Sequence, residues 1–547
     1  MSELLDGYDA KAFLDEAFEP DCTPRPHYAT VLETIQKLGC EELERRAELQ
    51  DTMQRSRGIT FRVYKEGTPA ERTFPLDLVP RIIPADEWAD LEAGLIQRVQ
   101  AMNLFLEDIY GEQQILHDGV IPPWVVLSSP QFQRRAWGIK PPLGVHVHVA
   151  GLDLVRGDDG SWQVLEDNLR VPSGASYVIE NREVLTRVLP ELFGQMPVRP
   201  VDHYPSLLRE ALRSVAPPSA GHEPTIVLLT PGVHNSAYFE HSLLARHMGV
   251  TLVEGPDLLV DSDVVWMRTT EGKQRVDVIY RRLDDEFLDP LALRPDSLLG
   301  VAGLLGAARA GQVTIANAVG NGVADDKAAF AFVPDMIRFY LNEEPKLASI
   351  PTYLCAEPDQ LEMVLQRLDQ LVVKPVDASG GYGMLIGPAA DDKQIVDFRE
   401  QLRRNPRGFI AQEVVRLSRH PTLLDGRLRP RHVDLRPFII QGDRVQVLPG
   451  GLTRVALPEG SLVVNSSQGG GSKDTWVLRD TVRTDRARER AHGRPLIRPL
   501  RSSEDDRASM QQPQQQQQQV DRDQRSHRPQ QQVDRDQRSH RPWGLGC

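Results

Sequence analysis

The chain has 547 residues, of which 40% are hydrophobic and 26% charged, a composition typical of a globular protein with two to four domains. No apolar run approaches the ~18 residues that a membrane span needs. The four cysteines are scattered and form no CxxC pair, which argues against a disulfide framework or a zinc ribbon. Residues 1–20 are acidic and lack an apolar leader. We therefore expect a cytoplasmic protein that needs no membrane.

The net charge of −13 is unevenly distributed along the chain. Residues 1–478 hold 49 basic and 67 acidic side chains, a balance of −18, whereas residues 479–547 have a balance of +5. So acidic a body argues against nucleic acid as the main partner, because phosphate backbones bind basic surfaces. It also favours a cationic amine over a polyanion as substrate.

The N-terminal region, residues 1–83, is predicted to be largely helical. Its ELERRAELQDTMQR segment is dense in helix formers, and only FRVY at 61–64 is typical of a strand. An amphipathic helix is predicted from 84 to 110, with Asp86 and Glu87 in its first turn and apolar residues spaced along one face. This helix opens a second segment, residues 84–220.

A β-hairpin is predicted within that segment, since HVHVAGLDLVR and SWQVLEDN are strand-like and GDDG is a turn signal. Asp153 lies on the first strand, and Glu166 and Asn168, two residues apart, project from one face of the second. Three oxygen donors on one face are a candidate Mg²⁺ site. The alternative, an acidic hairpin facing water, is about equally supported by the spacing. His146 and His148 receive no role.

Residues 221–320 are predicted to form a Rossmann-like domain. TIVLLTPG and VTLVEGPDLLV are expected strands, and NSAYFEHSLLARHMG between them is an expected helix with an Asn or Ser cap and a closing Gly249. This βαβ order indicates a parallel sheet. The G-x-G-x-x-G motif of a dinucleotide site is absent from the segment. Arg281 and Arg282 could hold an anion, but solvated or salt-bridged arginines are the better interpretation.

The segment 321–478 carries two lysines that suit phosphate binding. Lys327 lies in the first turn of an expected helix, where a cation opposes the helix dipole and so indicates a partner anion. LVVKPVDASGGYGM predicts a strand that ends at Lys374, a glycine-rich loop and a second strand. Glycines let backbone N–H groups approach an anion closely, and the lysine adds a mobile charge. The alternative is a plain hairpin. The loop residues concerned are Ser379, Gly380, Gly381 and Gly383.

The tail, residues 479–547, changes composition abruptly. It contains a polyglutamine run and two copies of QQQVDRDQRSHRP, with few residues that could build a core. Such a composition predicts disorder.

Five motifs in one order resemble a known family: VLEDNLRVPSGASYVIENR, ANAVGNGVADDKAAFAFVP, VVKPVDASGGYGM, PGGLTRVAL and NSSQGGGSKDTWVL. They resemble those of the circularly permuted ATP-grasp proteins (type 2), a group that is similar to glutathionylspermidine synthase. The resemblance covers about residues 20–478. It implies an α/β fold in which two α+β lobes hold ATP, with a Rossmann-like pre-ATP-grasp domain alongside.

The resemblance also implies roles for particular residues. Asp153, Glu166 and Asn168 would hold one or two Mg²⁺ ions, and Lys327 and Lys374 would contact the phosphates of ATP. The loop from Ser379 to Gly383 would close over those phosphates, and Glu413 would meet the adenine or ribose. Arg454 would stabilise the transferred phosphoryl group. In this set Lys374 and Arg454 are the candidate catalytic residues.

The chemistry so implied is ATP-dependent carboxylate–amine ligation through an acylphosphate, with a small-molecule or peptide carboxylate and an amine as substrates. A small-molecule kinase that uses the same site is one alternative, and a non-catalytic nucleotide-binding scaffold is another. An intact set of candidate residues argues against the scaffold. A protein partner from the same pathway and a homo-oligomer both remain open.

Overall fold

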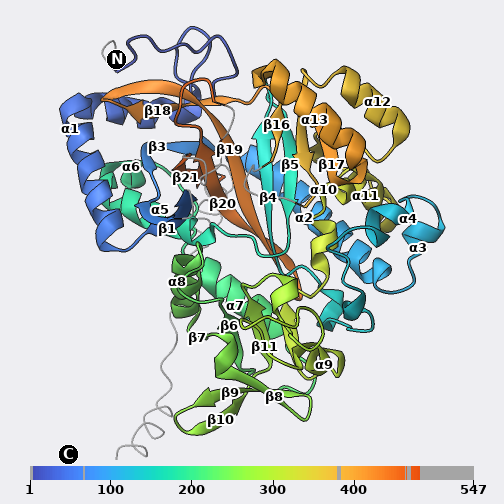
Figure 1. The fold of residues 1–547 in the computed structure, drawn as a ribbon. Helices are drawn as coiled ribbons and strands as arrows, with labels where there is room; N and C mark the ends of the chain where they lie inside the picture. The colour runs from blue at the N-terminus through green and yellow to red at the C-terminus, as the bar shows by residue number, and fades with distance from the viewer. Residues whose placement is uncertain (1–3, 66–67, 378–382, 462–463, 465–469, 481–547) are drawn as a thin grey trace, which may run out of the picture. The chain divides into compact units, whose positions relative to one another are not determined.

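The largest sheet combines strands from distant parts of the chain (Figure 1). The computed structural model describes residues 4–65, 68–377, 383–461, 464 and 470–480, without the side chains of 61–72. Within these residues the sheet has eight strands, in the order β13-β5-β4-β19-β20-β21-β3, with β18 paired to the start of β19. Their bounds are β3 (Leu76–Ile83), β4 (Val149–Arg156), β5 (Trp162–Asn168), β13 (Ala348–Ser349), β18 (Arg419–Leu424), β19 (Arg427–Gln441), β20 (Val445–Val455) and β21 (Gly471–Val477).

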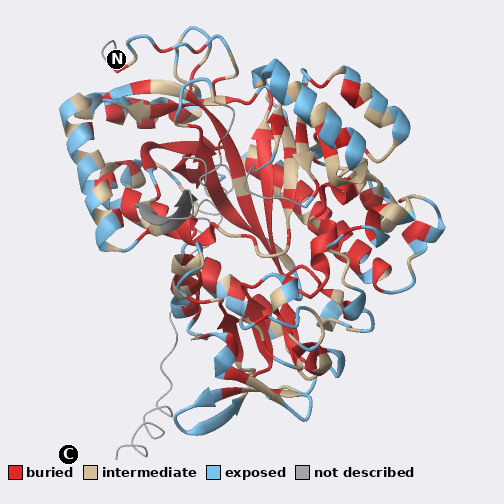
Figure 2. Ribbon diagram, in the orientation of Figure 1, coloured by how far each residue is buried: buried red, intermediate tan, exposed pale blue. Residues whose placement is uncertain are grey.

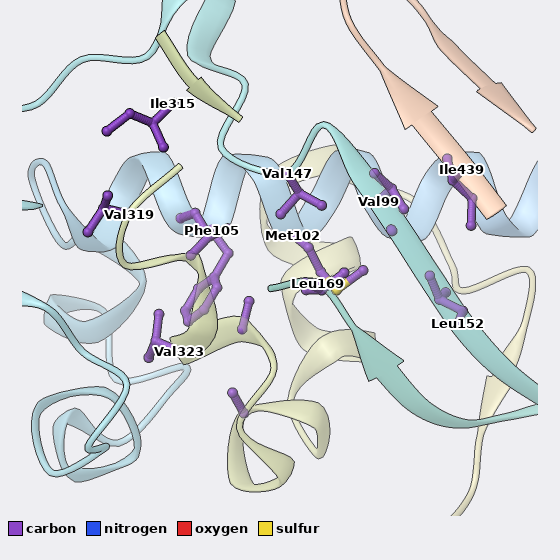
Figure 3. Close-up of a cluster of buried hydrophobic side chains, with 14 of the residues drawn as sticks. Val99, Met102, Phe105, Val147, Leu152, Leu169, Ile315, Val319, Val323 and Ile439 are labelled. Atoms are coloured by element: carbon purple, nitrogen blue, oxygen red, sulfur yellow. The ribbon is translucent and has the colours of Figure 1, made fainter. Parts of the chain in front are cut away.

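Helix α2 (Ala85–Ile109) covers one face of this sheet, as Figure 3 shows. Its Val99, Met102 and Phe105 pack with Leu152 of β4 and Ile439 of β19 in one buried cluster. The predicted helix is thereby confirmed, with acidic residues in its first turn and its apolar face buried. The short helices α3 (Gln114–His117) and α4 (Pro123–Leu127) follow it.

A second buried cluster lies on the other face. It includes Val178 and Leu185 of α5 and Phe438, Leu452 and Trp476 of the sheet. The helices that contribute to this side are α1 (Ala29–Ser56), α5 (Ala175–Val188), α6 (Pro190–Gln195), α7 (Tyr204–Ser214) and α8 (Tyr238–Met248). Figure 2 shows the result, buried strands between helices whose outer faces are exposed.

The N-terminal region is less helical than predicted. Helix α1 contains the expected ELERRAELQDTMQR segment, and FRVY lies in β1 (Thr60–Lys65), which pairs with β2 (Thr68–Thr73). The unexpected element is β3, which joins the large sheet parallel to β21. Every residue of β3 is buried, so its sequence shows no alternation between polar and apolar residues.

The Rossmann-like prediction is confirmed by a parallel sheet in the order β12-β11-β6-β7. Its strands are β6 (Ile226–Leu229), β7 (Thr251–Val253), β11 (Val278–Arg281) and β12 (Thr314–Ala316), with α9 (Leu304–Arg309) before the last. Helix α8 ends at Gly249 as predicted, with φ 67°. It begins after Ala237 without a side-chain cap, so the predicted Asn or Ser cap is wrong.

The prediction of one strand over VTLVEGPDLLV is also wrong. The segment is interrupted by a short 3-10 turn, Gly255–Asp257. Only glycine fits at its first position, because a Cβ there would lie 2.5 Å from the Leu299 carbonyl oxygen. The second half enters a separate antiparallel sheet of β8 (Leu258–Asp261), β9 (Val264–Thr269) and β10 (Gly272–Arg275). Arg281 and Arg282 are buried and form ion pairs with Asp285 and Glu240, which confirms the salt-bridged interpretation.

A smaller lobe carries Lys374. Its sheet has the order β14-β17-β15-β16, and the β15–β16 pair confirms the predicted strand-loop-strand. The elements are β14 (Thr352–Leu354), β15 (Leu371–Pro375), β16 (Leu385–Ile386), β17 (Phe409–Glu413), α12 (Pro358–Gln366) and α13 (Asp392–Arg404). Helices α10 (Lys327–Phe330) and α11 (Val333–Leu341) precede this lobe in sequence. In the described residues we find no helix with the length and apolarity of a membrane span.

Candidate active site

The predicted hairpin exists and brings its polar residues together. Strands β4 and β5 are antiparallel, with Asp153 opposite Glu166 and Gly151 opposite Asn168. These residues therefore share one face of the sheet. The neighbouring Leu152 and Leu154 point to the opposite face and join the cluster under α2. Alternation along one strand thus separates the core from the candidate site.

Asp153 lies at the centre of a cluster of buried charges. The Arg436 guanidinium donates to both of its oxygens, at 2.5 and 2.8 Å, and Arg454 Nη2 donates to its Oδ2 at 2.7 Å. Arg454 is also bound by Asp434, opposite it in the β19–β20 ladder. Burial raises the pKa of the Asp153 carboxyl, but the two arginines outweigh it and hold that pKa well below its usual range.

Two members of this cluster, Asp434 and Arg436, escaped sequence analysis. They alternate on β19 and so occupy the same face as Asp153. The signal that could have found them is VDLRPFII, an apolar, strand-like run that is interrupted by two opposite charges spaced two apart. Charged residues rarely enter a central strand unless they are paired.

The two predicted lysines converge on the hairpin from separate elements. Lys327, at the start of α10, forms an ion pair with Glu166 at 2.9 Å. Lys374, on β15, donates to Gln412 Oε1 at 2.6 Å. Burial lowers the pKa of Lys374 to about 8; the Glu166 carboxylate opposes this shift, and the Lys327 ammonium adds to it. Lys374 thus lies within electrostatic range of both Glu166 and Lys327.

Gln412 links the small lobe to the large sheet. Its Nε2 donates to Thr352 Oγ1 at 3.0 Å and to the Leu165 carbonyl oxygen of β5 at 3.5 Å. Gln412 lies opposite Val372 in the β15–β17 pair, on the same face as Lys374. This face of the small lobe is the one that meets the hairpin.

Glu413 lies on the other face of the small sheet. It binds the Tyr353 hydroxyl at 2.6 Å and Arg367 at 3.0 Å, beside the helices of the lobe. The structure therefore does not bring it to Lys374, and its nucleotide role stays a prediction. Of the predicted phosphate loop, Gly383 is described, with φ 69°. Ser379, Gly380 and Gly381 lie outside the described residues.

The donor set at the hairpin suits a small hard cation. Asp153, Glu166 and Asn168 offer two carboxylates and one amide, which are the oxygen ligands that Mg²⁺ combines with substrate phosphates. Asn168 would offer its Oδ1 to the cation, and its Nδ2, a donor, is buried without a hydrogen-bond partner among the described residues. No group of three or more His, Cys, Asp or Glu side chains within the described ranges is arranged to hold a metal. A magnesium ion here would therefore also need the Asn168 amide oxygen and phosphate oxygens of the bound nucleotide as ligands.

The loop after β12 fixes the hairpin to the Rossmann-like sheet. The Asn317 side chain accepts from the His148 and Val149 N–H groups and donates to the carbonyls of Val149, Leu169 and Arg170, at 2.6–3.1 Å. Asp325 binds Arg170 at 2.7 Å beyond the same strand end. The ANAVGNGVADDK motif thus has a structural function as well as carrying Lys327.

His146 and His148 are buried, and burial lowers their pKa values to about 4 and about 3. They are therefore neutral at physiological pH, in keeping with the absence of an assigned role.

Comparison with known proteins agrees with this architecture. The family model described as circularly permuted ATP-grasp type 2 matches residues 80–456. A protein of Synechocystis sp. is 54% identical over 479 residues, which cover 87% of this chain and 99% of that protein. A protein of Frankia alni named putative glutamate–cysteine ligase 2-3 is 49% identical over 478 residues, 87% of this chain but 55% of its own length.

Among solved structures, a glutathione synthetase-like effector of Globodera pallida in its apo form aligns with a TM-score of 0.50 and 12% identity. The alignment covers 84% of this chain and 100% of that chain. At so low an identity the likeness concerns the fold alone. The family model, in contrast, spans the hairpin, both lysines and Arg454. The chain belongs to the circularly permuted ATP-grasp type 2 family.

Proposed function

We propose that this chain is an ATP-dependent ligase that joins a carboxylate to an amine through an acylphosphate intermediate. The observation that carries the proposal is the convergence of Lys327, Lys374 and Arg454 on the face that bears Asp153 and Glu166. These side chains come from separate parts of the sequence, and a purely structural need would not gather three cations beside two carboxylates and an amide. Family membership and the ligase name of the Frankia relative support the same reaction class.

In the proposed reaction a carboxylate oxygen of the acid attacks the γ-phosphorus of ATP, and the bond from that phosphorus to the β–γ bridging oxygen breaks to release ADP. The amine then attacks the acyl carbon, loses a proton and displaces phosphate, which leaves an amide. Phosphoryl transfer depends mainly on positioning and on neutralising negative charge. The lysines and arginines of this site supply both.

Each charged residue has a defined part in this scheme. Lys374, with a pKa of about 8, is mainly protonated at neutral pH and can donate to a phosphate oxygen. Arg454 and Arg436 share Asp153, so either guanidinium can turn toward the transferred phosphoryl group while the other keeps the carboxylate paired. Mg²⁺ held by Asp153, Glu166 and Asn168 would neutralise charge on the phosphate oxygens.

The test is ADP release from ATP and Mg²⁺ with pools of amino acids, small peptides and polyamines, with hydroxylamine added to trap an acylphosphate. We expect acid-dependent ADP release with hydroxamate formation, reduced about 100-fold or more in Lys374→Ala. Lys393→Ala, an exposed lysine on α13, is the matched control and should retain full activity. A phosphorylated product without an amide would identify a kinase instead. ATP binding that is equal in both variants would contradict the assigned site.

A further inference from the structure

A polar cavity of about 300 Å³ lies between the N-terminal segment and the paired ends of β18 and β19. Its wall includes Arg419, Arg429, Arg431 and His432. Two carboxylates, Asp9 and Glu459, also line it, and both are exposed to solvent. Three arginines around one small cavity stand out in a chain whose residues 1–478 have a balance of −18.

The guanidinium of Arg419 is the main candidate in this cavity for binding a ligand. Phe13 lies against its guanidinium, 4.0 Å from the ring centroid. Among the described residues this guanidinium donates no hydrogen bond and forms no ion pair, although the side chain is only partly exposed. Burial lowers the pKa of Arg419, Asp9 and Tyr8 oppose the shift, and Arg431 adds to it. A guanidinium in this setting gains most from a planar oxyanion that accepts two of its N–H groups.

The neighbouring side chains are fixed in place by the backbone. Arg431 donates to the Leu457 carbonyl at 2.8 Å, and its Nη2 lies 3.9 Å from the exposed Glu459. The ring of His432 is buried, and its Nδ1 is 2.9 Å from the Leu417 carbonyl, so Nδ1 carries the hydrogen. His432 lies directly opposite Arg419 in the β18–β19 ladder. A rigid wall of this kind lowers the entropy cost of binding.

We propose that this cavity, the Arg419 cavity, is an oxyanion-binding site that takes a carboxylate or a phosphate group. It is separate from the lysines of the candidate active site but shares a strand with it. His432 and Arg436 are four residues apart on one face of β19, roughly 13 Å at the usual rise of a strand. That span suits the far end of an acidic substrate whose reacting carboxylate lies near Arg436, a role that rests on the proposed function.

The test is titration calorimetry of the full chain with glutarate, with inorganic phosphate and with chloride at matched ionic strength. We expect glutarate or phosphate to bind, and chloride not to. Arg419→Gln should weaken this binding about tenfold or more. The matched control is Arg416→Gln, because Arg416 also packs on Phe13, at 4.6 Å, yet does not line the cavity. Glutarate and phosphate in separate titrations show which oxyanion the cavity prefers.

The outcomes separate this proposal from the proposed ligase function. Oxyanion binding that Arg419→Gln weakens and that Lys374→Ala leaves unchanged supports the cavity, whether or not the chain turns over ATP. Binding that is lost in Lys374→Ala but kept in Arg419→Gln would place the anion at the nucleotide site and overturn the proposal. Equal losses in Arg419→Gln and Arg416→Gln would show a general charge effect, and would overturn it as well.

Discussion

At the scale of single residues, the candidate site contains groups whose pKa values are shifted by their surroundings. Lys374 is the clearest example, because burial and Lys327 lower its pKa from 10.5 to about 8 against the pull of Glu166. A lysine that titrates near pH 8 loses its attraction for phosphate within an accessible pH range. An arginine at the same position would not, since its guanidinium stays charged.

We therefore expect the ATP dissociation constant of the wild type to rise above pH 8, by up to about tenfold per pH unit, because only the protonated lysine binds the phosphate well. Lys374→Arg should bind with little pH dependence over the same range. Calorimetry in buffers of different ionisation enthalpy would also detect proton uptake on binding above pH 8. A wild-type affinity that is constant from pH 7 to 9.5 would contradict the assignment of Lys374 to the phosphates.

The same shift predicts the sign of a stability change. The unfolded chain holds the lysine proton up to about pH 10.5, whereas the folded chain releases it near pH 8. Between these values the unfolded state binds more protons, so this group makes the folded state relatively more stable as pH rises through the window. Below pH 8 the half-buried Lys374 ammonium is a net cost to folding.

Asp434 is the residue on which the position of Arg454 depends. It is fully buried, and its carboxylate accepts hydrogen bonds from Nε and Nη2 of Arg454, the same Nη2 that also donates to Asp153. Asp434→Asn should destabilise the folded state by about 3 kcal/mol, because it leaves a buried guanidinium with one carboxylate fewer. Chemical denaturation measures this change. Asp335→Asn, which removes an exposed partner of Arg338, should cost less than about 0.5 kcal/mol. Similar costs for the two variants would refute the structural role of Asp434.

At the scale of elements, helices and strands with a clear hydrophobic periodicity could be predicted from the sequence. Elements whose residues depend on contacts with distant segments could not. Helix α2 and the β4–β5 hairpin have clear periodicities, so both follow from the sequence. Strand β3 does not, because it is buried on both faces and its LDLVPRII sequence includes a proline and an arginine. The arginine, Arg81, is tolerated because Glu16 forms an ion pair with it from a distant segment. No local window contains that partner.

The candidate site divides in the same way. Motifs identified Asp153, Glu166, Lys327 and Lys374, which the structure gathers. Short motifs could not show which face of β17 Glu413 would occupy, since a shift of one residue reverses the face of a strand. Nor could they show that Arg436 reaches Asp153, because the two residues meet only when β19 pairs with β4. Contacts between strands that are distant in sequence could not be predicted from a single sequence.

Asn317 connects two elements whose relative position defines the site. Its amide joins the start of β4 and the end of β5 to the loop that leads to Lys327. Asn317→Ala should destabilise the protein by about 3 kcal/mol, because it leaves several buried backbone groups without partners. Gln366→Ala, on the exposed side of α12, is the control and should change little. Urea unfolding at two protein concentrations gives both values, and a cost below about 1 kcal/mol for Asn317→Ala would show that the loop is held by other contacts.

At the scale of the whole molecule, the candidate site forms only when strands from distant parts of the chain pair in the large sheet. The hairpin that offers the oxygen donors precedes the lysine-bearing lobe in sequence, and it joins the rest of the large sheet only when β19 pairs with β4. The last strand, β21, then pairs with β3 from the N-terminal region. Residues near both ends of the described chain are therefore needed before the site can form.

This arrangement predicts where the chain can be shortened. Directly after β21, the backbone N–H of Leu478 donates to the Ile83 carbonyl and that of Arg479 to the Pro197 carbonyl. A chain that ends at Asp480 keeps both hydrogen bonds and loses a segment whose glutamine-rich repeats cannot build a core. We expect its free energy of unfolding, measured by urea denaturation, to match that of the full chain within about 0.5 kcal/mol. A chain that ends at Ser472 loses most of β21 and should fail to fold, because β3 and β20 would lose their shared neighbour. A lower midpoint for the chain ending at Asp480 would instead assign the tail a stabilising contact with the folded part.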